Sequence, residues 1–267
     1  MKICLSIGYP IKTSRSPLMH NAGYKKLKID NEFIYLSAEV KPEDLKMAVD
    51  GVRVLGIRGV SVTMPLKLEV MKYLDKIENS AKIINAVNTI VNDNGKLTGF
   101  NTDWIGAQTA LEKRTNLKGK RVALIGAGGA ARALCYMLNK KGAITKIFNR
   151  TLDQAKKLAS EFDCEFSGLN SLEQVSDMDI IINATSIGMN EDKSPLNKDF
   201  LKKGQLVFDI VYSPKITKLI KDAKEKGVQV ILGYEMLLYQ GVEQFKLFTG
   251  LNAPVEAMRK TLVKDLS

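Results

Sequence analysis

The segment "KRVALIGAGGAARALCYMLNKKG" (residues 120–142) decides the fold. It reads as an apolar strand, a glycine-rich turn and a helix that ends at Gly142. Gly126, Gly128 and Ala131 have the G-x-G-x-x-A spacing, in which the first glycine permits a tight turn and the second lets backbone approach a pyrophosphate. The start of the helix would then face the phosphate anion. We therefore predict a dinucleotide-binding turn, with a purely structural turn as the alternative.

The pattern continues from this turn to residue 232. Apolar strands such as "ITKIFNR", "DIIINATSIG", "GQLVFDIVY" and "VQVILG" alternate with helices such as "LDQAKKLASEF" and "ITKLIKDAKEKG". Continuous apolar strands separated by helices indicate a parallel sheet that is covered on both faces. We count six strands between residues 121 and 232, which predicts a Rossmann-type, doubly wound domain.

The end of the second strand of this domain bears on the choice of cofactor. It reads "IFNRT" (residues 147–151) and has no carboxylate at its tip, where an NAD enzyme usually has one. Arg150 can pair with a ribose 2′-phosphate, so we expect NADP. The alternatives are that Arg150 is an ordinary surface arginine, or that Asp153 accepts from the ribose diol of NAD.

The first 102 residues form a second α/β region. We predict strands at 2–8, 33–39, 56–63 and 88–93, helices near 17–27, 43–54 and 67–83, a type I′ hairpin at 92–97, and a helix from 103 to about 114. Two more helices, near 234–248 and 254–264, finish the chain.

The stretch "SVTMPLK" (residues 61–67) raises the question of catalysis. Pro65 removes a donor and holds Met64 extended, so a strand should end here and leave Lys67 in the loop. Lys67 is either a solvated cation or a working group. His20 is the single histidine and has no metal-ligand spacing around it, so Lys67 with Asp103 is the pair available to move a proton.

Polar residues follow several strands of this first region. Thr63, Asn88, Asn101, Thr102 and Asp103 suit a polyhydroxylated ligand with one anionic group, because ligands of α/β sheets bind at strand ends. Ser14 and Ser16 stand at a helix start, where their hydroxyls could hold a carboxylate. Local sequence leaves two alternatives open, in which Ser16 and Asp103 merely cap their helices.

Composition narrows the class of protein. The net charge of +11 is spread along the chain, and no nucleic-acid motif accompanies it. No apolar run approaches the roughly 20 residues of a membrane span. Cys4, Cys135 and Cys164 are scattered, which favours a reducing compartment, the cytoplasm, over disulfides or zinc. We expect a small-molecule ligand, no metal, no nucleic acid and no membrane.

The motifs together resemble those of the shikimate dehydrogenase family over nearly the full length. The matching stretches are "SRSPLMHN", "SVTMPLK", "NAVNT", "GFNTD", "GAGGAARA", "NRT", "NATSIGM", "DIVYSP" and "GYEMLLYQG". The resemblance implies reversible, NADP-dependent reduction of 3-dehydroshikimate to shikimate, in the biosynthesis of chorismate and aromatic amino acids. It also implies two α/β domains with a cleft between them: residues 1–103 completed by 236–267 for the substrate, and 104–235 for NADP. A homodimer is left open.

The same resemblance assigns site residues. Lys67 would be the catalytic acid/base, with Asp103 beside it. Shikimate would be held by Ser14, Ser16, Thr63, Lys67, Asn88, Asp103, Tyr212 and Gln240. The NADP site would be lined by Gly126, Ala127, Gly128, Gly129, Ala130, Asn149, Arg150, Thr151, Thr185, Ser186, Met189, Ile210, Gly233 and Met236.

Two positions depart from the family pattern. Ser61 stands where an asparagine is usual, and Gln154 stands where NADP-committed members often have a second basic residue. The second departure keeps an alternative open, an NAD-preferring or dual-cofactor quinate/shikimate dehydrogenase.

Overall fold

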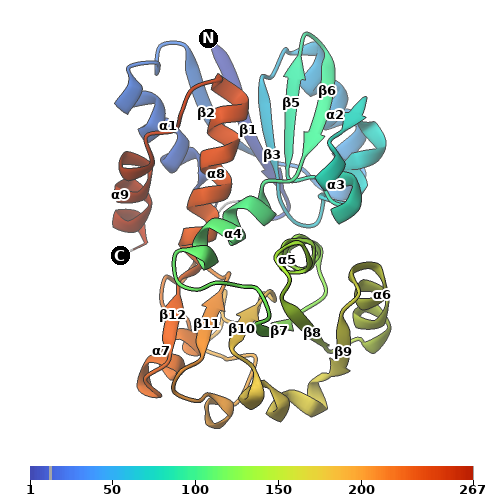
Figure 1. The fold of residues 1–267 in the computed structure, drawn as a ribbon. Helices are drawn as coiled ribbons and strands as arrows, with labels where there is room; N and C mark the ends of the chain where they lie inside the picture. Colours follow the sequence, from blue (N-terminus) through green and yellow to red (C-terminus); the bar gives the residue numbers. More distant parts are fainter. Residues whose placement is uncertain (12–13, 267) are drawn as a thin grey trace. The chain divides into compact units, whose positions relative to one another are not determined.

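A computed structural model describes residues 1–11 and 14–266. The chain divides into two compact units, which Figure 1 shows as two separate sheets with their helices. The first unit contains Met1–Gly106 together with Leu238–Asp265, and the second contains Ala107–Leu237. Within the described residues, no helix is both long and apolar enough to cross a membrane.

The first unit is built on a mixed sheet of six strands in the order β2-β1-β3-β5-β6-β4. Its elements are β1 (Lys2–Gly8), α1 (Ser16–Leu27), β2 (Phe33–Glu39), α2 (Leu45–Val54), β3 (Gly59–Val62), β4 (Lys76–Ile77), α3 (Asn79–Ile84), β5 (Thr89–Asp93) and β6 (Lys96–Phe100). The β5–β6 hairpin turns at Asn94 and Gly95, which both have positive φ. The predicted type I′ hairpin is thus confirmed.

The strand directions gather the predicted polar residues at one edge of this sheet. β1 and β3 are parallel, whereas β5 runs antiparallel to β3 and β6 runs antiparallel to β5. The carboxyl ends of β1, β3 and β6 therefore share an edge with the start of β5. Backbone bonds join these ends directly: Val62 N–H donates to Asn88 O at 2.7 Å, and Asn88 N–H donates to Phe100 O at 3.1 Å.

The predicted helix at 67–83 is wrong. This stretch forms a 3₁₀ helix at Glu69–Tyr73, the short strand β4, and α3. Edge pairing with β6 overrides the helical pattern, because Asp75 N–H donates to Leu97 O and its carboxylate accepts from Leu97 N–H. Glu78 then starts α3 afresh by accepting from Ser80 N–H at 2.8 Å.

The C-terminal helices complete the core of the first unit. They are α8 (Gly233–Thr249), which crosses into this unit at Leu238, and α9 (Val255–Asp265), which packs on α1. Phe248 of α8 lies so close to β3 that a Cβ added to Gly59 would come within 2.2 Å of its ring. Arg58, which precedes Gly59, donates from its Nε to Phe248 O at 3.0 Å. The fold class predicted for this region is confirmed.

His20 lies at the centre of this core. Its ring is fully buried and stacks on Tyr35, with 4.3 Å between the ring centroids. The structure places it in an aromatic cluster with Tyr24, Phe245 and Phe248. It therefore has a packing role.

Burial lowers the pKa of His20 from 6.5 to about 3, so the folded unit keeps the ring neutral where the unfolded chain protonates it. Above pH 6.5 the ring is neutral in both states, and burying it costs no stability. Between pH 6.5 and about 3 the free energy of unfolding falls by about 1.4 kcal/mol for each pH unit. Chemical denaturation of the wild type and of His20→Phe at neutral and mildly acidic pH measures this slope. The variant should lose less stability on acidification, and equal losses would contradict the expectation.

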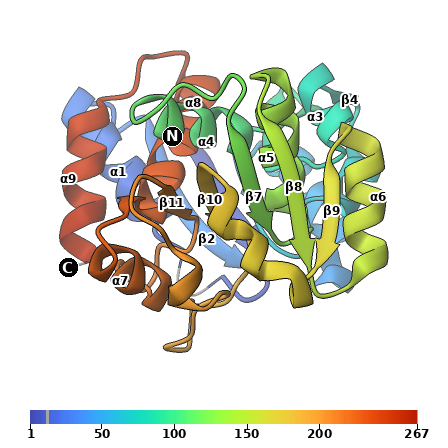
Figure 2. The ribbon, with the colours of Figure 1, turned by 60° about the horizontal axis from the view of Figure 1, so that its bottom comes forward.

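The second unit is a parallel sheet of six strands in the order β12-β11-β10-β7-β8-β9. Its elements are β7 (Arg121–Ile125), α5 (Gly129–Lys140), β8 (Ile144–Asn149), α6 (Leu152–Phe162), β9 (Glu165–Gly168), β10 (Ile180–Asn183), β11 (Leu206–Asp209), α7 (Lys218–Glu225) and β12 (Gln229–Ile231), preceded by α4 (Asp103–Glu112), which crosses from the first unit. Figure 2 shows β7, β8 and β9 side by side. The order reverses between β7 and β10, which is the switch point where doubly wound sheets bind ligands. The predicted six-stranded Rossmann-type sheet is confirmed.

Candidate active site

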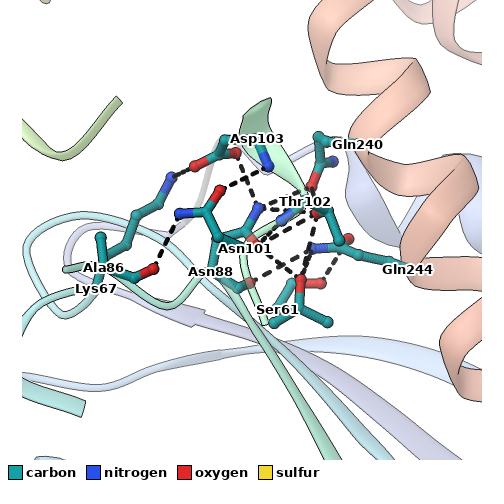
Figure 3. A network of polar contacts seen from close by, with 10 residues as sticks. Ser61, Lys67, Ala86, Asn88, Asn101, Thr102, Asp103, Gln240 and Gln244 are labelled. Carbon is teal, nitrogen blue, oxygen red and sulfur yellow. Dashed lines mark hydrogen bonds and ion pairs between the residues drawn. The ribbon is translucent and has the colours of Figure 1, made fainter. Parts of the chain in front are cut away.

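Lys67 and Asp103 meet in the first unit although 36 positions separate them in sequence. Lys67 lies in the loop after β3, where its carbonyl accepts from Val87 N–H at 2.8 Å. Asp103 begins α4 directly after β6. Lys67 Nζ lies 2.5 Å from Asp103 Oδ2, and the two side chains are only 13% and 8% exposed. Figure 3 shows this ion pair at one end of a polar network.

Asn88 holds the other oxygen of the Asp103 carboxylate. Its Nδ2 donates to Asp103 Oδ1 at 2.8 Å, and its Oδ1 accepts from Thr102 N–H at 2.7 Å. Because a backbone N–H can only donate, Asn88 Oδ1 must face Thr102, and Nδ2 is left to face the carboxylate. The two oxygens of Asp103 thus have separate partners, one amide and one ammonium.

Asn101 fixes the backbone at the start of α4. Its Oδ1 accepts from Asp103 N–H at 3.0 Å, and its Nδ2 donates to Ala86 O at 3.0 Å. The loop that carries Asn88 and the turn that carries Asp103 are therefore tied together (Figure 3). Such an arrangement can hold a lysine ammonium in one place, where it can donate a proton to a developing alkoxide.

The remaining predicted substrate residues of the first unit lie around the same sheet edge. Thr63 follows β3 and packs on Gly8 at the end of β1. Ser14 Oγ lies 3.4 Å from Ser6 Oγ of β1. Gln240 of α8 comes within 3.5 Å of Asn88 Nδ2 through its Oε1. Tyr212 belongs to the second unit, where it lies half-buried beyond the end of β11.

The start of α1 tests the capping alternative for Ser16. The helix begins at Ser16 itself, its N-cap is Arg15, and no side chain makes a capping hydrogen bond there. Ser16 is nevertheless buried. Capping therefore does not explain this serine.

If these hydroxyls hold the substrate carboxylate, as the sequence resemblance implies, Ser14→Ala and Ser16→Ala should act mainly on the substrate KM. A hydroxyl bonded to a carboxylate contributes about 1.5–3 kcal/mol, so each KM should rise by about one to two orders of magnitude with little change in kcat. Steady-state kinetics and thermal melting of both variants measure this. A lower melting temperature with unchanged KM would give Ser16 a purely structural role.

The glycine turn joins β7 to α5 in the second unit. Gly126 has φ +112°, and a Cβ there would lie 3.0 Å from Ala184 O, so a side chain would be both strained and crowded. Gly128 is the N-cap of α5, and a Cβ at this position would meet nothing within 4 Å. Ala131 is fully buried. The turn leaves open space at a helix N-terminus, which fits a pyrophosphate.

The predicted 2′-phosphate residues lie between β8 and α6. Asn149 Nδ2 donates to Thr151 O at 2.9 Å and to Gln154 Oε1 at 3.3 Å, which shapes the turn. Arg150 is exposed, and no acidic side chain in the described part of the chain pairs with it. Asp153 is also exposed, in the first turn of α6.

A buried polar network lies at the ends of β10 and β11. Asn183 Oδ1 accepts from the hydroxyl of Thr185 at 2.7 Å, and Asn183 Nδ2 donates to Asp209 Oδ1 at 2.9 Å. The same Asp209 oxygen accepts from Val211 N–H at 3.1 Å. Burial raises the pKa of Asp209. This network orders both loops that carry the predicted residues Thr185, Ser186, Met189 and Ile210.

Gly233 and Met236 follow β12 at the start of α8. A Cβ on Gly233 would lie 2.4 Å from Val211 O, so the helix start can approach the β11 loop only with glycine at this position. Met236 is buried. The described residues contain no group of three or more His, Cys, Asp or Glu side chains that could hold a metal ion.

Sequence reasoning did not single out Gln244, Thr89, Asn183 or Asp209. Gln244 had an accessible signal, because it follows Gln240 by four residues and so shares its face of α8. Asn183 and Asp209 end otherwise apolar strands, where a polar residue must have a buried partner.

Comparison with known proteins finds three family descriptions along the chain. "Shikimate dehydrogenase substrate binding domain" matches residues 6–90, "Shikimate / quinate 5-dehydrogenase" matches 108–231, and "Shikimate 5'-dehydrogenase C-terminal domain" matches 233–263. The shikimate dehydrogenase (NADP(+)) of Pyrococcus furiosus is 48% identical over 97% of this chain and 94% of its own.

Two solved structures are similar over the whole chain. A shikimate dehydrogenase in complex with NADP+ has a TM-score of 0.95 and 40% identity, and the match covers 100% of this chain and 96% of that one. The shikimate 5-dehydrogenase of Thermus thermophilus in complex with NADP(H) and shikimate has a TM-score of 0.92 and 34% identity, with 99% of each chain covered.

Proposed function

The chain belongs to the shikimate dehydrogenase family, and we propose that Lys67 and Asp103 form the acid–base pair of its reaction. It is an NADP-dependent oxidoreductase that interconverts shikimate and 3-dehydroshikimate. The observation that carries the catalytic assignment is the 2.5 Å ion pair between two nearly buried side chains at the sheet edge. Its place in the molecule matches a substrate site of an α/β sheet.

In the reducing direction, the Lys67 ammonium stabilises the oxygen that becomes negative at C3 and gives it a proton. In the oxidising direction, the neutral amine takes the proton from the C3 hydroxyl. Asp103 Oδ2 keeps Lys67 Nζ in place. Asn88 donates to Asp103 Oδ1 and so prevents the carboxylate from rotating away from the lysine. NADP supplies the other half of the chemistry as the hydride acceptor or, when reduced, the donor.

The other polar residues of the first unit bind and orient the substrate. Ser14 and Ser16 would hold the carboxylate, and Thr63, Asn88 and Gln240 would hold the hydroxyl groups. Tyr212 is a further proposed substrate residue. On this basis we assign residues 1–103 and 236–267 to shikimate and residues 104–235 to NADP. The edge of the mixed sheet presents neutral hydrogen-bonding side chains beside the Lys67–Asp103 pair, which suits a polyol acid.

The second unit fits NADP on its own features. The open space above Gly128 at the N-terminus of α5 suits the pyrophosphate. Arg150, which is exposed and pairs with no acid among the described residues, suits the 2′-phosphate. Thr185, Ser186, Met189, Ile210, Gly233 and Met236 would surround the nicotinamide end. The buried Asn183–Asp209 hydrogen bond would hold the loops after β10 and β11, which carry Thr185, Ser186, Met189 and Ile210, in place.

A direct assay tests the proposed function. Purified protein should reduce NADP with shikimate, and quinate should serve less well under the same conditions, because the site is assigned to shikimate. A complete lack of turnover with both acids would refute the proposal. A higher kcat/KM with quinate than with shikimate would make quinate the preferred substrate.

We also propose a cytoplasmic location, supported by Cys4, Cys135 and Cys164, which are all free thiols. A homodimer is a further proposal, which light scattering tests by a mass of twice 29.6 kDa.

A further inference from the structure

Gln244 connects to the acid–base pair without touching it. This glutamine of α8 is 1% exposed and lies beneath Asn88 on the side away from Lys67 (Figure 3). Its Nε2 donates to Thr89 Oγ1 at 2.9 Å and to Asn88 O at 3.4 Å, and its Oε1 accepts from Ser61 Oγ at 2.8 Å. Each side of the amide therefore has a partner.

The orientation of the Gln244 amide follows from its neighbours. Asn88 O is a backbone carbonyl and can only accept, so the NH₂ group of Gln244 must face it. The carbonyl oxygen then faces Ser61, whose hydroxyl must donate to it. Ser61 is therefore left to accept from the Tyr35 hydroxyl, which lies 2.5 Å away. Tyr35 is fully buried, and burial raises its pKa, so it stays a donor.

The chain of donors continues in one direction to the carboxylate. Thr89 accepts from Gln244 and so directs its own hydrogen to Asn88 Oδ1, 2.8 Å away. Asn88 Nδ2 then donates to Asp103 Oδ1 at 2.8 Å. The order is Tyr35, Ser61, Gln244, Thr89, Asn88 and Asp103, and in each pair the first residue donates to the second. Hydrogen bonds arranged head to tail strengthen one another.

We propose that Gln244 is a positioning residue, which anchors Thr89 and the Asn88 carbonyl and thereby supports the Asn88 side chain that holds Asp103 with Oδ2 turned towards Lys67. The proposal rests on the proposed function, because it needs Lys67 and Asp103 to be the acid–base pair. The amide accepts from Ser61 and donates to Thr89 at the same time. A carboxylate would accept from both, and Thr89 would then withdraw its hydrogen from Asn88.

Two substitutions of Gln244 separate the effect of its hydrogen bonds from the effect of its size. Gln244→Glu keeps the shape and reverses the direction at Thr89, whereas Gln244→Met keeps the length and removes all three hydrogen bonds of the amide. We expect kcat for shikimate oxidation to fall about tenfold in either variant, with the KM for NADP unchanged. Gln205→Met is the matched control, since Gln205 is similarly buried and donates to Val175 O and Met178 O in the second unit. It should lose stability and keep kcat.

A double-mutant cycle gives the decisive readout. If Gln244 acts through Asp103 on Lys67, Gln244→Met should cost nothing further in a Lys67→Ala background, because the lysine that Asp103 orients is gone. An equal fractional loss in both backgrounds would overturn the proposal, as would wild-type kcat in folded Gln244→Met. Thr89→Val breaks the same chain one step closer to Asn88 and serves if the Gln244 variants do not fold. Unchanged kcat in Thr89→Val would also overturn it.

The same measurements distinguish failure of the positioning role from failure of the proposed function. If Lys67→Ala keeps most of its kcat, the proposed acid–base pair itself is wrong. If Lys67→Ala is nearly inactive while Gln244→Met and Thr89→Val turn over normally, only the positioning role is wrong.

Discussion

Lys67→Ala is expected to lower kcat by about two to four orders of magnitude, which corresponds to about 3–5 kcal/mol of activation free energy. The reason is that the substitution removes the ammonium that gives the proton in one direction and takes it in the other. Asn88 and Asp103 remain in place through their own hydrogen bond, so the affinity for shikimate should change only a few-fold. Steady-state kinetics and calorimetric binding of shikimate measure both quantities.

Removal of Lys67 also leaves the nearly buried Asp103 carboxylate without its cation, which lowers the stability of the fold. Lys67→Arg is therefore a useful companion, because it keeps the charge while its guanidinium does not give up a proton in proteins. It should fold normally and still be slow. Lys72→Ala is the matched control, since Lys72 is an exposed lysine near Lys67 in sequence that pairs with Glu69.

A different result would reassign Lys67. If kcat in Lys67→Ala stays within about tenfold of the wild type while KM rises, the lysine binds substrate and does not move the proton.

Arg150→Ala is expected to raise the KM for NADP by about 30- to 150-fold and to leave the KM for NAD nearly unchanged. The two cofactors differ by one phosphate on the adenosine ribose. Arg150 is exposed, has no acidic partner in the part of the chain described, and can meet phosphate oxygens with two parallel N–H groups. Asn149 and Thr151 would retain part of the site, so binding should weaken and not vanish.

Asp153 gives this prediction its control. Asp153→Ala should leave the NADP preference intact or increase it, because an exposed carboxylate close to Arg150 in sequence can only repel a phosphate. A wild-type ratio of kcat/KM for NADP over NAD near one, or below it, would contradict the role of Arg150. Such a ratio would favour the quinate/shikimate alternative.

The second unit could be predicted almost completely from the sequence. Its signals are local: each strand is a continuous apolar run, and the glycines of the turn have a fixed spacing in which Gly126 needs positive φ. Parallel sheets bury both faces of their strands, so the pattern stays clear along the whole unit. Lys67 and Asp103 could also be named, since each follows a strand end.

The features that could not be predicted from the sequence depend on contacts between segments that are far apart in the chain. The stretch at 67–83 has a helical pattern, yet the pairing of Asp75 with Leu97 of β6 breaks it. Gln244 looks like any polar residue of an amphipathic helix until the fold brings it to Thr89, 155 positions away. Asp209 likewise becomes informative only when Asn183 and Thr217 are seen around it.

The pH dependence of kcat, compared between the wild type and Lys67→Ala, tests the acid–base assignment most directly. The kcat profile reports the groups that ionise in the substrate complex during the chemical step. If Lys67 moves the proton, shikimate oxidation by the wild type should show a limb that rises with pH, and this limb should disappear in Lys67→Ala, leaving a low, flat rate. If the same limb persists in the variant, another group moves the proton and the assignment of Lys67 is contradicted.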